Sequence, residues 1–74
     1  DNKEPKGLSR FFLSHREINA SAVARRAGIS PNLMAQYISG AKEPSKEREM
    51  HIMQTVIAMV NDVAMAATEV TKQI

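Results

Sequence analysis

The stretch VARRAGISPNLMAQYISG, Val23 to Gly40, constrains the fold more than any other part of the chain. Gly28 follows the helical run ASAVARRA, where a helix must stop, because glycine enters the left-handed conformation without a Cβ clash. Ser30 and Pro31 then restart a helix, since serine caps a helix and proline fits its first position. The pattern predicts two short helices joined by a tight turn, with the second helix ending at Gly40.

Two helices in this geometry cross closely, and the sequence meets that demand. A small residue belongs at the crossing, and Ala24 supplies it. Ile29, directly after the turn, is the apolar residue that fills the core beneath it. The other positions predicted to face inward are Val23, Ala27, Met34 and Tyr37. Their spacing of three and four residues matches one face of each helix.

The flanking segments are also helical in pattern. From Gly7, the spacing of Leu8, Phe11 and Phe12, with His15 at the edge of the same face, predicts a first helix of about three turns. Asn19 is the expected N-cap of the next helix, and Ile18 the apolar residue before it. Pro44-Ser45 opens a last helix, with Glu47 and Glu49 in its first turn. A chain of 74 residues is one domain at most.

The last helix has two possible forms. No Gly or Pro occurs from Lys46 to Ile74, so one helix could run to the end. Alternatively, Asn61-Asp62 could cap a fifth helix that folds back on a monomer. The expected fold is therefore an all-α bundle of four to five helices. We divide it into a flexible arm at 1–6, a helix-turn-helix domain at 7–60 and a helical extension at 61–74.

Residues 19–45 resemble the Cro/lambda-repressor-like, or XRE-type, helix-turn-helix family. VARRAGIS is similar to the family's first helix and turn, MAQYISG to its recognition helix, and GAKEPS to the loop before its fourth helix. With the first helix, the resemblance covers roughly 7–60. It implies a compact lambda-repressor-like bundle, and a cytoplasmic transcriptional regulator of the repressor type that binds specific sequences in double-stranded DNA.

The resemblance also implies which residues meet DNA, with the helix Pro31–Ser39 in the major groove. Gln36 is the best candidate to read a base, since its amide can bond an adenine edge, and Asn32 is the second. The whole expected DNA surface is Arg25, Ser30, Pro31, Asn32, Ala35, Gln36, Ser39, Lys42 and Lys46. Gln36 and Asn32 could instead be merely solvated polar positions. The sequence departs from the family at Pro31, where a long polar residue often reads a base, and at Ala20, where a Gln often contacts phosphate. Since Ala35 offers only a methyl group, base reading by one copy is sparse.

A heptad-like apolar stripe on the last helix suggests pairing with a second copy. The helix is apolar on most sides, and the three short helices can cover only its first half. The expected dimerisation residues are Met53, Ile57, Val60, Val63, Ala64, Ala67 and Val70. A homodimer would place two recognition helices on one site and compensate for sparse base reading.

Charge and composition narrow the function classes. Residues 1–48 hold nine Lys/Arg against five acids, a net charge of +4, whereas 49–74 hold one against three, a net of −2. The basic half is thus the helix-turn-helix half, as a polyanion surface requires, although a solubilising surface would look the same. The chain has no Cys, and His15 and His51 lie 36 residues apart without a spaced acidic partner. We therefore expect no enzyme, cofactor or metal site, and no membrane span. The alternative function is a protein-interaction or dimerisation module on the same fold.

Overall fold

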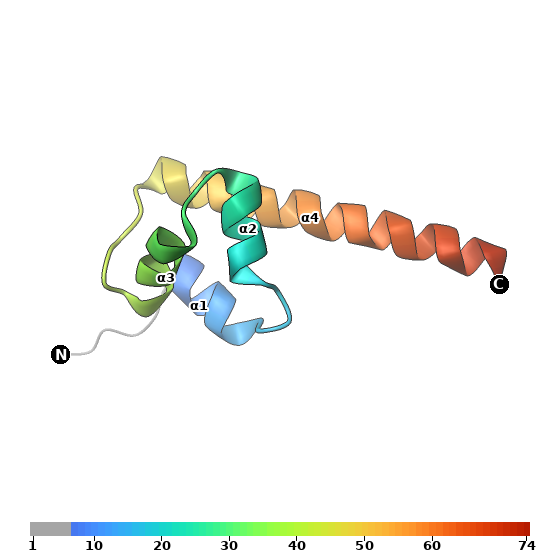
Figure 1. The fold of residues 1–74 in the computed structure, drawn as a ribbon, viewed down its shortest axis with the longest axis horizontal. Helices are drawn as coiled ribbons and strands as arrows, with labels where there is room; N and C mark the ends of the chain where they lie inside the picture. The colour runs from blue at the N-terminus through green and yellow to red at the C-terminus, as the bar shows by residue number, and fades with distance from the viewer. Residues whose placement is uncertain (1–6) are drawn as a thin grey trace.

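The computed structural model describes residues 7–74, and every element in that range is a helix. The four helices are α1 (Gly7–Ser14), α2 (Ala20–Ala27), α3 (Pro31–Ser39) and α4 (Lys46–Gln73). The expected all-α class and long last helix are confirmed, with four helices rather than five. The arm expected at 1–6 lies outside the described residues. α2 packs against both α3 and α4, and α1 packs against α3 (Figure 1).

The helix-turn-helix segment begins and ends where its capping residues predicted. The Asn19 side chain accepts hydrogen bonds from the Ser21 and Ala22 N–H groups at 2.9 and 3.2 Å. Gly28 ends α2 with φ +80°, and Gly40 ends α3 with φ +89°. These left-handed conformations allow the chain to leave each helix sharply.

The core lies where the three short helices meet the first half of α4. It is formed by Leu8, Phe12, Val23, Ala24, Ile29, Met34, Tyr37, Ile52 and Val56. Ala24 and Val23 are fully buried, so the small-residue crossing is confirmed, whereas Ala27 is only half-buried. α1 is shorter than expected and ends at Ser14, which leaves His15 exposed instead of on the inner face. His15 there contacts the Phe11 ring and the Glu17 carboxylate.

Glu49 joins α4 to the start of α1. Both Glu47 and Glu49 lie in the first turn of α4, as predicted. In addition, the Leu8 N–H donates a hydrogen bond to the Glu49 carboxylate at 3.1 Å. Gly7 has φ +53°, a left-handed conformation that favours glycine, and a Cβ there would also displace the Glu49 carboxylate. Glu49 therefore caps a second helix that lies 41 residues away in the sequence.

α4 is one unbroken helix of 28 residues, and the alternative with a break at Asn61-Asp62 is wrong. Its first half lies across the bundle, and its second half continues well beyond it (Figure 1). The molecule measures 52 × 24 × 19 Å, and its radius of gyration is 14.2 Å. A compact chain of this length would have a radius of gyration of about 11 Å. The expected compact bundle is thus confined to the helices up to the middle of α4.

Candidate nucleic-acid interface

α3 presents one polar face to solvent and buries the other. Met34 and Tyr37 face the core, with Leu33 and Ile38 half-buried beside them. The exposed side consists of Pro31, Asn32, Ala35, Gln36 and Ser39. All five belong to the DNA surface expected from the sequence. The helix therefore offers a neutral face with two amide side chains and without a carboxylate.

The turn between α2 and α3 holds this face in place. The Ile29 N–H donates to the Ala24 carbonyl at 2.8 Å, and the Gly28 N–H to the Arg25 carbonyl at 3.2 Å. On the opposite side, the Ser9 hydroxyl of α1 donates to the Ile38 carbonyl at 2.6 Å. The turn is thus bonded back to α2, and α3 is bonded near its end to α1, a contact that sequence patterns did not predict.

The N-terminus of α3 has few free donors. Ser30 accepts a hydrogen bond from the Leu33 N–H at 3.1 Å through its hydroxyl, and from the Met34 N–H at 3.0 Å through its carbonyl. Pro31 has no N–H. Among residues 7–74, nothing accepts from the remaining first-turn donor, the Asn32 N–H. A phosphate at this end could therefore accept from that N–H and from the Ser30 hydroxyl.

The C-terminal end of α3 is fixed by hydrogen bonds around the Gln36 carbonyl. The Ser39 hydroxyl donates to it at 3.2 Å, and the Lys42 N–H donates at 3.1 Å. Ser39 also accepts from the Ala41 N–H at 3.3 Å, so its hydroxyl serves the local turn. These bonds use the backbone of Gln36 and leave its amide side chain exposed. They also hold Lys42 beside the end of α3.

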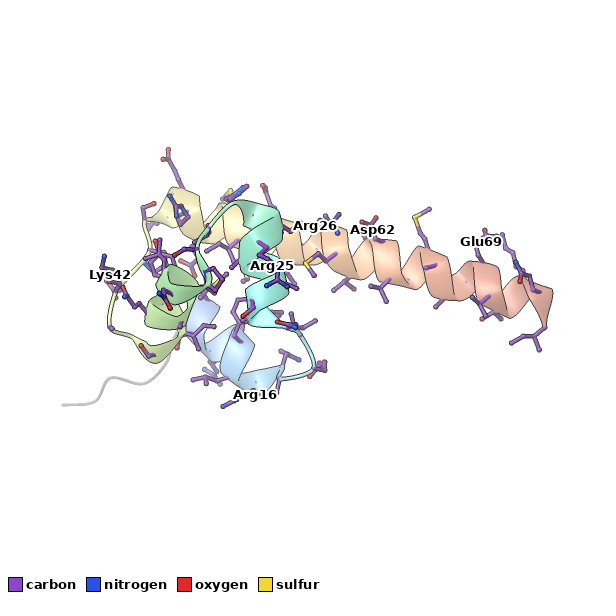
Figure 2. All side chains as sticks on the ribbon, in the orientation of Figure 1. Arg16, Arg25, Arg26, Lys42, Asp62 and Glu69 are labelled. Atoms are coloured by element: carbon purple, nitrogen blue, oxygen red, sulfur yellow. The ribbon has the colours of Figure 1, made fainter. Side chains whose placement is uncertain are left out.

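Exposed basic side chains lie on the segments next to α3 in the chain. In the view of Figure 2, α3 lies between Lys42 and Arg25, which projects from α2. Lys42, Lys46 and Arg25 are exposed, and none forms an ion pair with another residue in the range 7–74. Arg26 differs, because its guanidinium pairs with the Asp62 carboxylate of α4 at 2.6 Å. Of the two adjacent arginines, Arg25 is the one free to bind another anion.

The residues expected to dimerise lie at the other end of the molecule. Met53 is half-buried and packs against the core of its own chain, so it differs from the rest of the set. The remaining members, all exposed, are Ile57, Val60, Val63, Ala64, Ala67 and Val70. By length and composition alone, α4 is also long and apolar enough to cross a membrane.

Sites for other chemistry are sparse in the described part of the chain. No group of three His, Asp or Glu side chains in residues 7–74 could hold a metal ion. The Nε2 of His51 donates to the Ala27 carbonyl at the end of α2, at 2.9 Å. Glu17 pairs with His15 at 3.2 Å, and its pKa is lowered by a hydrogen bond from its own backbone N–H and, secondarily, by His15. Both histidines thus have structural contacts.

Comparisons with known proteins assign this chain to no family. No known family model matches the sequence, and searches of curated proteins and of solved structures found no similar chain. The function is therefore argued from the geometry of the α3 face and its surroundings.

Proposed function

We propose that this protein binds double-stranded DNA with α3 in the major groove, as a sequence-specific transcriptional regulator of the repressor type. The observation that carries the proposal is the exposed face of α3, neutral and bearing two amides, with exposed basic side chains on the neighbouring segments. The major groove is wide enough to admit an α-helix, and its base edges offer the donors and acceptors that amide side chains recognise.

Each residue has a specific task in this proposal. Gln36 and Asn32 lie one helical turn apart on the exposed face, and each can bond the N6 and N7 atoms of adenine. Ala35 offers a methyl group suited to a thymine methyl. These contacts select bases, whereas contacts to phosphates fix the position of the helix on the duplex.

The phosphate contacts come from the residues around α3. Lys42, Lys46 and Arg25 provide free cationic side chains. Ser30 and the Asn32 N–H provide neutral donors at the start of α3. The resemblance of residues 19–45 to Cro/lambda-repressor-like proteins supports the same orientation of the helix and a cytoplasmic role.

The experiment is selection of bound sequences from random duplexes, followed by titration of the selected duplex. Gln36→Ala should weaken binding by about 1–3 kcal/mol on a site with its preferred base, and by less on a site altered at that base pair. Gln54→Ala is the matched control, since Gln54 is an exposed glutamine on α4. Equal losses on both duplexes would show that Gln36 reads no base.

A second candidate is an interaction module that does not bind DNA, and the exposed half of α4 favours it. Non-specific DNA binding depends on cationic contacts that strengthen as salt is lowered. Failure to shift any duplex at low salt would therefore reject DNA binding and leave the interaction module.

A further inference from the structure

The second half of α4 is an apolar helix without a partner in the described chain. Every residue from 60 to 74 is exposed. Val63 is 67% exposed, Val70 59% and Ile74 fully so. Monomeric soluble proteins rarely leave such a continuous apolar surface in water, and large exposed patches mark interaction sites.

This segment continues the packed first half of α4, which provides its helical nucleus, but it gains no packing energy of its own in the described chain. Most helical stability in proteins comes from packing an apolar face. Val60, Val63 and Val70 lower the intrinsic helix propensity further, because β-branched side chains lose rotamer freedom in a helix. Packing against another surface would provide the missing stabilisation.

The apolar positions follow a heptad in one register. Val60, Ala67 and Ile74 occupy position a, and Val63 and Val70 occupy position d. The flanking e and g positions carry no charge; they are Ile57, Met59, Ala64, Ala66, Thr71 and Gln73. Thr71 donates its hydroxyl to the Ala67 carbonyl, so its polar atom is satisfied within the helix. Asp62, Glu69 and Lys72 all fall at c and f, on the opposite side.

We propose that residues 57–74 pair with the same residues of a second copy as a parallel two-stranded coil. An uncharged a/d/e/g face is complementary to itself, as a two-fold interface requires, and brings no like charges together. A helix is about 12 Å across and residues 57–74 rise about 27 Å, so half of this surface is about 500 Å² per copy. Two copies would bury about 1,000 Å², near the lower limit for a specific interface, and a weak dimer follows.

The parallel orientation rests on the proposed DNA binding. α3 lies toward the end of the molecule opposite the C-terminus (Figure 1). A parallel pair places both copies of α3 at one end, where a single duplex can meet them. In an antiparallel pair centred on the segment, the two Ile52 residues alone would be about 40 Å apart, with the α3 helices farther out. That excludes half-sites one helical turn, about 34 Å, apart, whereas a parallel pair keeps the two α3 helices at the same end.

Single cysteines can determine the orientation, since the chain has no Cys of its own. In a parallel pair, Val63→Cys and Val70→Cys each face their own counterpart, and each should form a disulfide-linked dimer under a glutathione redox buffer. In an antiparallel pair, at most one of them could do so, and mixing the two variants would favour the mixed dimer. Met65→Cys is the control, because Met65 lies at position f, 69% exposed, and should remain unlinked.

Sedimentation without DNA tests the pairing separately from the proposed function. We expect a monomer–dimer equilibrium at micromolar concentration. Val63→Glu should raise its dissociation constant at least about tenfold, because burying an unpaired carboxylate costs more than about 1.4 kcal/mol. Far-ultraviolet circular dichroism of this variant should still show a folded helical protein.

The outcomes separate the two proposals. A wild-type monomer at all concentrations, or a monomer that binds phosphatidylcholine vesicles through this helix, overturns the pairing and leaves DNA binding to be judged by the duplex titration. An antiparallel cross-linking pattern overturns the orientation. A parallel dimer that shifts no duplex supports the pairing and rejects DNA binding.

Discussion

Arg25 and Arg26 form a matched pair of neighbours on α2 that tests the proposed contact with DNA. The Arg26 guanidinium is 2.6 Å from the Asp62 carboxylate, whereas Arg25 has no carboxylate partner among residues 7–74. Arg25→Ala should therefore remove one phosphate contact per copy. Arg26→Ala, which changes the net charge by the same amount, should leave the number of phosphate contacts unchanged.

The magnitude follows from counterion release. The slope of the logarithm of affinity against the logarithm of salt concentration is about −0.9 for each phosphate neutralised. With Arg25, Lys42 and Lys46 as contacts, the expected slope is about −2.7 per copy, and Arg25→Ala should reduce it to about −1.8. Between 50 and 200 mM salt, the variant should lose about 3.5-fold less affinity than the wild type per copy.

The assay is fluorescence anisotropy of a labelled duplex across this salt range. Arg26→Ala should reproduce the wild-type slope while lowering stability by about 0–1 kcal/mol through loss of an exposed ion pair. Thermal melts confirm that both variants are folded at the assay temperature. Equal reduction of the slope by both substitutions would refute the reasoning, since it would mean that the Asp62 pair does not hold Arg26 away from DNA.

Other predictions concern stability and ionisation. Gly28→Ala should cost about 1–2 kcal/mol in urea unfolding, from the left-handed backbone alone, because the space around it is open. Ala24→Leu should cost about 1–3 kcal/mol in the same assay, since Ala24 is fully buried at the crossing. Glu49→Ala should cost about 0.5–2 kcal/mol as a lost helix cap. The pKa of Glu17, measured by NMR titration, should lie below its usual value and rise only in part in His15→Ala. Because the folded-state pKa is lowered, this contribution to stability is present above the unfolded pKa and lost as pH falls through the folded pKa.

Sequence patterns predicted the helix boundaries and buried faces, which depend on residues close together in the sequence. Asn19, Gly28 and Ser30 each set a helix boundary through their own side chain or backbone, so their roles could be read from neighbouring residues. The alternation of buried and exposed positions in α3 was predictable for the same reason, because it follows from helical spacing.

The features that sequence patterns did not predict depend on contacts between residues far apart in the sequence. Asp62 looked like a helix cap, but its carboxylate pairs with Arg26, 36 residues earlier, and α4 continues through it. Glu49 was predicted in the first turn of the last helix, and its carboxylate in addition caps α1. Neither contact could be predicted from spacing, because each depends on how the helices pack.

Two contacts between α2 and α4 bear on the proposed DNA binding. His51 holds the Ala27 carbonyl and Asp62 holds Arg26, two points about 16 Å apart along α4. These two contacts restrain rotation of α2 about α4, so the orientation of the helix-turn-helix is coupled to the middle of α4. A dimer built on α4 would then have little freedom to adjust to the distance between half-sites. Inserting a single base pair between them should abolish cooperative binding even when both half-site sequences are intact.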